Sequence, residues 1–303
     1  MRLPSVGVVL PTLERPLLLA EALEAVLAQT YTGHIEVAVV YDRGTPDPRL
    51  ARAGTRPVRL MSNDRTPGLA GARNSGILGM STDLVAFCDD DDVWLPHKLA
   101  TQVAALQASG TGRFSTCAIS VDYRGQLSHR LARRTEVRHE DLLRSRMSML
   151  HSSTFLADRT FLVDVVGLLD EEAPGSQNED WDLLLRATEH LPIVHVDSPL
   201  VRVRWGVNSY FARQWQSRAD SLSWMLQKHP DIMTSDVGSA RVFGQLAFAH
   251  AAMGSRRESR RWAARALRAN PGEWRAVAAL SVAVGVVAPG RVLDVLHRYG
   301  RGV

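Results

Sequence analysis

The apolar run Leu84-Val85-Ala86-Phe87-Cys88 is followed directly by four aspartates, Asp89 to Asp92. Such a run predicts a buried strand, and open α/β sheets bind ligands beyond the carboxyl ends of their strands. In extended backbone, side chains two residues apart share a face, so Asp89 and Asp91 point the same way. Carboxylates this close raise one another's pKa unless a cation lies among them. A hard divalent cation, Mg²⁺ or Mn²⁺, suits such oxygen ligands and attracts phosphate. The alternative interpretation of the four aspartates is a solvated acidic loop.

Strands and helices alternate along the N-terminal part of the chain. Short runs rich in β-branched residues predict buried parallel strands at 6–10, 35–40, 58–61 and 84–88. Apolar residues at helical spacing predict helices from Pro16 onward and over 71–80. This order is typical of the nucleotide-binding half of an α/β fold. Further along, we expect a helix at 96–106, a strand at 114–121, and helices at 159–166 and 180–189.

The domain organisation that we expect has two parts. Residues 1–210 form an α/β domain, with a donor half at 1–110 and an acceptor half at 111–210, and residues 211–303 form a helical C-terminal region. The segment Gly254 to Pro271 resembles one helix pair of a tetratricopeptide-type repeat, but it occurs once, and such repeats need about three copies to be stable. A helical appendage packed on the main domain is therefore the expectation. The apolar residues of 277–296 suit a membrane surface, the main domain or a second subunit.

Composition narrows the class of protein. The chain has 303 residues, 45% of them hydrophobic, with a formal net charge of +4 and only two lysines, Lys98 and Lys228. Arginines spread along the chain do not make a nucleic-acid footprint, so we expect no nucleic-acid partner. Cys88 and Cys117 lie in apolar runs and indicate core positions in a reducing compartment. With no signal-peptide core, and a longest apolar stretch at 276–288, we expect a cytoplasmic protein, with the inner face of the membrane as an alternative location.

Five ordered segments between about residues 5 and 210 together resemble the family 2 glycosyltransferases. The segments are Val8 to Pro16, Val37 to Asp42, Ala72 to Gly76, Phe87 to Trp94, and Glu179 to Asp182. The resemblance implies a GT-A fold, a Rossmann-like mixed sheet flanked by helices. It also implies an inverting enzyme that moves a sugar from a nucleotide-diphospho-sugar, linked to UDP, dTDP or GDP, to a hydroxyl acceptor on a glycan, a lipid-linked sugar or a natural product.

The resemblance assigns a donor site. Pro11 and Thr12, with Glu14 and Arg15 beside them, match the segment that lines the nucleotide. Asp42 matches the aspartate that hydrogen-bonds the base, and its alternative is a turn aspartate before Gly44. Arg73 matches an element near the diphosphate, and its alternative is a plain surface arginine.

The aspartate run has its own roles in this resemblance. Asp89 and Asp91 match the DXD pair that holds Mn²⁺ or Mg²⁺, with Asp89 or Asp90 also near ribose. Asp92 is either a spare ligand or, as we favour, the cap of the helix that follows Pro96.

The acceptor side is expected near Glu179-Asp180-Trp181. Asp180 matches the catalytic base, because inversion requires a proton acceptor on the face of the sugar opposite the leaving group. Glu179, Trp181 and His151 are the candidate acceptor-binding residues, with Trp181 as a platform for a sugar ring. First-turn acids favoured by the helix dipole are the alternative explanation of Glu179 and Asp180.

Some positions depart from the family pattern. Asp182 points about 200 degrees around a helix from Asp180, so we expect it to be structural. Some relatives have a histidine near Arg204 that completes the metal shell, but Arg204-Trp205-Gly206-Val207-Asn208 contains none. Two rival functions are a sugar nucleotidyltransferase and a non-catalytic scaffold. The first is disfavoured because the segment after the first strand, Pro11 to Arg15, has no glycine-rich loop.

Overall fold

One mixed sheet organises the protein. The computed structural model describes residues 2–205 and 214–298, and within them ten strands form one sheet. The N-terminal half contributes the parallel strands β1 Val6–Thr12, β2 Ile35–Tyr41, β3 Val58–Ser62 and β4 Leu84–Phe87, in the order β3-β2-β1-β4. Val8 of β1 lies opposite both Val37 and Ala86, so β1 is central and buried on both sides. The Rossmann-like half predicted from the sequence is therefore confirmed.

The second half of the sheet is mostly antiparallel where it joins the first. It comprises β5 Val93–Trp94, β6 Phe114–Tyr123, β7 Gln126–Arg130, β8 Glu136–Val137, β9 Leu156–Asp158 and β10 Ile193–Trp205. Strand β9 pairs antiparallel with both β4 and β6, which joins the two halves, whereas β6 and β10 pair in parallel. The resulting mixed sheet agrees with the predicted fold class.

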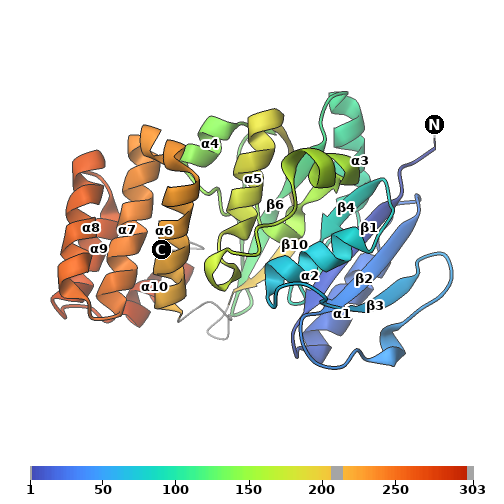
Figure 1. Cartoon of the computed structure of the whole chain (residues 1–303), viewed down its shortest axis with the longest axis horizontal. Coiled ribbons are helices and arrows are strands. Elements are labelled where there is room, and N and C mark those ends of the chain that lie inside the picture. Colours follow the sequence, from blue (N-terminus) through green and yellow to red (C-terminus); the bar gives the residue numbers. More distant parts are fainter. Residues whose placement is uncertain (1, 206–213, 299–303) are drawn as a thin grey trace.

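Helices cover both faces of this sheet (Figure 1). Helices α1 Pro16–Leu27 and α3 Lys98–Ser109 pack on the face to which Val8 and Leu10 point. Helices α2 Leu69–Leu78, α4 His139–Arg144 and α5 Glu179–His190, with the π-helical segment Phe161–Val166, cover the opposite face with Val9. Helix α2 sits very close to β1, because a Cβ on Gly76 would lie 2.4 Å from the Val9 side chain. That close approach requires glycine at this position.

The C-terminal region is helical, as predicted. It contains α6 Trp215–Lys228, α7 Asp236–Ala252, α8 Arg256–Ala269, α9 Trp274–Ala283 and α10 Pro289–Arg298. The segment 254–271 contains one helix, α8, and not the helix pair suggested by its sequence. One hydrophobic cluster runs from the sheet face through Leu184 of α5 to Phe248 of α7 and Ala279 of α9. This shared core holds the helices beside α4 and α5 (Figure 1). The proposed domain boundary at 210 lies outside the described residues.

The apolar C-terminal run is divided between two helices. In the described part of the chain, every helix is too short or too polar to cross a bilayer. Gly285, at φ +82°, lies between α9 and α10. Val277, Val284, Val286 and Val295 are exposed. Contact of 277–296 with a membrane surface or a second subunit stays a prediction. The residues from 299 onward, beyond this run, lie outside the described residues.

Asp182 links α5 to the helical region. Its carboxylate is fully buried and lies 2.8 Å from each of Arg186, Lys228 and His229. Burial alone would raise the pKa of Asp182, but the bond to His229 and the ion pair with Arg186 hold that pKa well below its usual range. The structural role expected for Asp182 agrees with these contacts.

We predict that Asp182→Ala lowers the free energy of unfolding by about 3–5 kcal/mol, because the substitution leaves buried cations without their counter-charge. Urea unfolding followed by circular dichroism measures this loss. The pKa of Asp182 is depressed in the folded state, so its contribution is complete above the unfolded carboxyl pKa of about 3.9 and declines as the pH falls further. The deficit of the variant should therefore narrow below about pH 4. Exposed Asp164→Ala is the control, and an equal loss in both variants would contradict this role.

Candidate active site

The carboxyl ends of three parallel strands meet at a cavity of about 580 Å³. Pro11 and Thr12 end β1, Asp42 follows β2, and the run Asp89 to Asp92 follows β4. All of these residues line the cavity, together with Arg15. The structure thus brings together the residues that the sequence placed on the donor side, with two exceptions. Exposed Glu14 lines neither this cavity nor the second one described below, and Arg73 lines only the second.

Asp90 and Asp91 are held by the segment that follows β1. The Thr12 hydroxyl donates to Asp90 at 2.8 Å, and Arg15 Nη1 lies 2.8 Å from Asp91 Oδ2 and 3.3 Å from Asp90 Oδ1. Burial raises the pKa of Asp90 to about 6. Burial and the neighbouring Asp89 charge also raise the pKa of Asp91. Raised carboxyl pKa values indicate a site that is short of positive charge.

Asp42 has a second task in addition to facing the cavity. Its Oδ1 accepts from the Gly68 backbone N–H at 2.6 Å and from the Asn63 side chain at 2.8 Å, while Oδ2 lies 3.5 Å from Arg43. Gly68 immediately precedes α2 and has φ +130°, which favours glycine. Asp42 therefore anchors the loop that leads into α2.

Arg73 is a buried ionic link. Its guanidinium donates to Asp89 at 2.6 Å, to Glu179 at 2.6 Å and to Ser152 at 2.9 Å. Burial opposes its charge, but Asp89 and Glu179 outweigh burial and raise the pKa of Arg73. Burial likewise would raise the pKa of Asp89, yet Arg73 holds it below its usual range. The alternative that Arg73 is a surface arginine is wrong, because the residue is 0% exposed.

Three side chains could hold a metal ion together, and the sequence did not predict that two of them, Asp92 and His151, would lie side by side. Ligand atoms of Asp89, Asp92 and His151 lie within 4.8 Å of one another, and His151 Nδ1 is 3.3 Å from Asp92 Oδ2. That Asp92 oxygen is buried and has no hydrogen-bond partner among the described residues. Burial and the charges of Asp91 and Asp89 raise its pKa well above the usual range. An orphaned carboxylate oxygen beside another carboxylate and an imidazole fits a divalent cation such as Mn²⁺.

The expectation that Asp92 caps the next helix is wrong. Helix α3 begins at Lys98, and its N-cap residue is His97, which makes no side-chain cap bond. Asp92 precedes the helix by too many residues to reach its first N–H groups.

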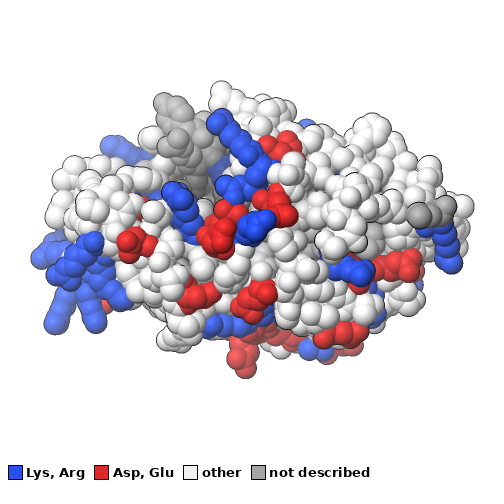
Figure 2. All heavy atoms as spheres, turned by 90° about the horizontal axis from the view of Figure 1, so that it is seen from above, with Lys and Arg blue, Asp and Glu red and all other residues white. Residues whose placement is uncertain are grey.

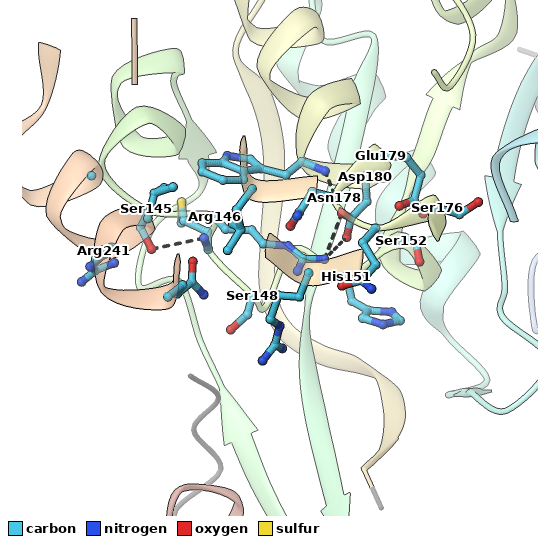
Figure 3. Close-up of a pocket in the computed structure, with 18 of the residues that line it drawn as sticks. Ser145, Arg146, Ser148, His151, Ser152, Ser176, Asn178, Glu179, Asp180 and Arg241 are labelled. Atoms are coloured by element: carbon cyan, nitrogen blue, oxygen red, sulfur yellow. Dashed lines mark hydrogen bonds and ion pairs between the residues drawn. The ribbon is translucent and has the colours of Figure 1, made fainter. Parts of the chain in front are cut away.

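A second cavity, of about 380 Å³, lies at the start of α5. Arg146 Nη2 donates to both oxygens of Asp180, at 2.9 and 2.7 Å (Figure 3). Burial would raise the pKa of Asp180, but Arg146 outweighs it and lowers that pKa. Burial and the Asp180 charge raise the pKa of neighbouring Glu179 to about 7. Two adjacent carboxyls thus have pKa values shifted in opposite directions. Arg146 carried no sequence signal, because it precedes Asp180 by 34 residues and belongs to no recognised motif.

The expectation that Trp181 is a sugar platform is not supported by its placement. Its side chain belongs to the hydrophobic core, is 3% exposed, and donates from Nε1 to the Leu142 carbonyl at 3.2 Å. Although Trp181 borders the second cavity, it offers almost no ring surface to a ligand.

The two cavities meet. Both are lined by Leu69, Asp89, His151, Ser176 and Trp205. His151, expected on the acceptor side, therefore lies at the junction, between the aspartate run and Asp180. The arrangement offers a carboxylate-rich pocket for a cation with phosphate, continuous with a pocket that contains an ionised carboxylate.

Comparison with known proteins finds relatives in sequence and in structure. Among curated proteins, the uncharacterized glycosyltransferase YwdF of Bacillus subtilis is 24% identical over 192 residues, which are 63% of this chain and 70% of YwdF. The solved structure of S. aureus TarS 1–349 in complex with UDP has a TM-score of 0.58 at 14% identity, over 94% of this chain and 91% of that one.

A second solved structure contains a metal ion. The mannosyltransferase PcManGT from Pyrobaculum calidifontis, in complex with GDP-Man and Mn²⁺, has a TM-score of 0.54 at 18% identity, over 99% of this chain and 85% of PcManGT. At these identities the two structures show a shared GT-A type of fold.

A family profile decides the assignment. The profile described as Glycosyl transferase family 2 matches residues 7–165, more than half of the chain. This match decides against the nucleotidyltransferase and scaffold alternatives. The chain belongs to glycosyltransferase family 2 and is a glycosyltransferase.

Proposed function

We propose that this protein transfers a sugar from a nucleotide-diphospho-sugar to an acceptor hydroxyl, with inversion at the anomeric carbon and with a divalent cation. One observation carries the proposal. The carboxylate-rich cavity at the strand ends joins the cavity of Asp180 at Asp89 and His151. A donor in the first cavity and an acceptor in the second would meet at that junction. Residues 1–210 would form the catalytic domain, with the donor bound by 1–110.

The nucleotide is expected in the cavity of about 580 Å³. Pro11 and Thr12 would lie against the base and Asp42 would accept its N–H groups, while Arg15 and Asp90 would face ribose or phosphate. Arg73 would act indirectly, because it is buried and holds Asp89. The complexes of TarS with UDP and of PcManGT with GDP-Man support a nucleoside diphosphate in this fold. UDP, dTDP and GDP remain candidates for this protein.

The cation is expected at the aspartate run. Asp89 would hold it, and the ligand atoms of Asp92 and His151 lie around the same point. Asp91, which pairs with Arg15 in the structure, is the second ligand expected from the sequence. Its chemistry there is to stabilise the negative charge that develops on the departing diphosphate. The Mn²⁺ in PcManGT supports this assignment, with Mg²⁺ as the alternative.

Asp180 would act as the catalytic base. Its lowered pKa keeps the carboxylate ionised at neutral pH, ready to accept the proton of the acceptor hydroxyl. Arg146 holds both oxygens and would orient the carboxylate toward the junction. Glu179, tied to Arg73, would fix the start of α5 beside the donor cavity.

We predict that Asp180→Asn lowers the rate of sugar transfer by about 10²- to 10⁴-fold, the usual contribution of a general base. Nucleotide affinity should stay unchanged, because Asp180 does not line the donor cavity. A panel of UDP-, dTDP- and GDP-sugars, first screened by thermal shift with Mn²⁺, supplies the donor for both measurements. Asp164→Asn, at an exposed site, is the control. Loss of nucleotide affinity equal to the loss of rate would remove Asp180 from the role of base.

We predict that Asp91→Ala abolishes the Mn²⁺-dependent part of nucleotide binding, because the cation would lose a carboxylate ligand. His151→Ala should weaken the same part, since the imidazole lies beside Asp89 and Asp92. Isothermal titration with Mn²⁺ and with EDTA measures both effects, again with Asp164→Asn as the control. Identical titrations of wild type and Asp91→Ala in Mn²⁺ would exclude Asp91 from the metal site.

A further inference from the structure

The second cavity, at the start of α5, is here called the acceptor-side cavity. More arginines than carboxylates line it, and the proposed role of Asp180 does not explain this excess of positive charge. Seven arginines and three carboxylates line it. Three of those arginines have carboxylate partners: Arg73 pairs with Asp89 and Glu179, Arg146 with Asp180, and Arg275 with Glu273. The donor cavity contains none of these seven side chains.

Three cavity arginines have no carboxylate within 4 Å among the described residues: Arg144, Arg218 and Arg241. The residues outside that description, which are 1, 206–213 and 299–303, include no aspartate or glutamate. Arg218 lies against the Trp215 ring, at 5.5 Å from its centroid. Arg275, although paired, keeps a buried Nε that has no hydrogen-bond partner among the described residues. Arg144, Arg218 and Arg241 therefore have no ion-pair partner in the described part of the chain, although the charge of Glu273 still acts on Arg241.

These cations repel one another in a partly buried setting. Burial and the nearby charge of Arg146 lower the pKa of Arg218 to about 10. Burial and the charge of Arg275 lower the pKa of Arg241, with Glu273 opposing them and Arg144 acting in the same direction as Arg275. Like charges held together out of water destabilise the free protein, and a bound anion would remove that cost. The planar guanidinium group of arginine can donate two parallel N–H bonds to the oxygens of one phosphate.

The helical region supplies two of the three cavity arginines that have no carboxylate partner in the described part of the chain. Arg218 lies on α6, Arg241 on α7 and Arg275 on α9, while Arg144 ends α4. Figure 3 shows Arg146 between Arg241 and Asp180. The arginines that line the cavity therefore extend toward the proposed base. In Figure 2, blue and red side chains gather in the middle of the face, between the helical region on the left and the sheet domain. A separate blue group at the left end belongs to α8, which carries six arginines outside the cavity.

We propose that the acceptor carries a phosphate ester or phosphodiester, which Arg218 and Arg241, with Arg144, bind while the acceptor hydroxyl reaches Asp180. This inference rests on the proposed function, because it takes the second cavity as the acceptor site. Phosphate of this kind occurs in a soluble sugar phosphate, a polyol-phosphate polymer and the headgroup of a diphospholipid-linked sugar. The helical region would thus select the acceptor.

The first test measures anion binding without any need to know the sugar. Orthophosphate and glycerophosphoglycerol, a phosphodiester, are titrated into wild type, Arg218→Gln/Arg241→Gln and Arg257→Gln, each with saturating nucleotide and Mn²⁺ in the donor site. Exposed Arg257 on α8 provides a control that also removes positive charge. We expect the double variant to bind at least about tenfold more weakly, since a charge-assisted bond to each arginine is lost, and the control to match wild type. Arg218→Lys/Arg241→Lys should recover part of the affinity, and melting temperatures check that each variant is folded.

Equal anion affinity in wild type and the double variant, or no binding to wild type, would overturn the inference. If no nucleotide binds, the proposed function fails instead, and the same titrations without nucleotide still report whether Arg218 and Arg241 form an anion site.

The second test identifies the source of the phosphate. Glucose 1-phosphate, glycerophosphoglycerol and a short-chain polyprenyl diphosphate-linked sugar are compared with neutral methyl glucoside, both as ligands and as acceptors. The phosphate-bearing compound that binds most tightly identifies the class of molecule that carries the phosphate. With it, Arg218→Gln should raise KM about tenfold at nearly unchanged kcat, because the arginine binds the acceptor without touching the reacting hydroxyl. Tighter binding of methyl glucoside than of all three phosphates would refute the assignment.

Discussion

One buried guanidinium holds the two halves of the site together. Arg73, on α2, donates to Asp89 at the end of β4 and to Glu179 at the start of α5, at 2.6 Å in both cases. Separating any member from this group would leave a charge buried without its partner, at a cost of about 3–5 kcal/mol. The aspartate run after β4 and the acids at the start of α5 are therefore fixed relative to each other. Such preorganisation is what electrostatic stabilisation of a transition state requires.

The charges around this link differ between the two sides. On the donor side, burial leaves Asp90, Asp91 and Asp92 with raised pKa values, which indicates missing positive charge. On the acceptor side, Arg146 keeps Asp180 ionised and further arginines remain without carboxylates. A cation with a nucleoside diphosphate would complement the first side, and an anionic acceptor the second. The first cavity thus lacks positive charge and the second lacks negative charge, and the two cavities meet at Asp89 and His151.

The helical region lines the second cavity because of the contacts that hold it against the sheet domain. It shares one hydrophobic cluster with the sheet domain, and Asp182 on α5 is bonded to Lys228 and His229 at the end of α6. Through these contacts α6, α7 and α9 form a wall of the acceptor-side cavity. The sequence suggested an appendage, because its helical periodicity carries no information about which surface it covers.

Local pattern was enough to predict the strands of the N-terminal half, the position of the aspartates beyond β4 and the family, since strand periodicity and motif order are properties of neighbouring residues. The resemblance to the family assigned Thr12, Asp42 and Asp89 to one site, and the structure places all three at one cavity. The partners of those residues were decided only by the tertiary structure. Arg146 reaches Asp180 across 34 residues, Arg73 reaches Glu179 across 106, and Asp92 faces His151 instead of capping α3. Trp181 became core for the same reason: burial depends on what packs from elsewhere in the chain, which no local spacing encodes.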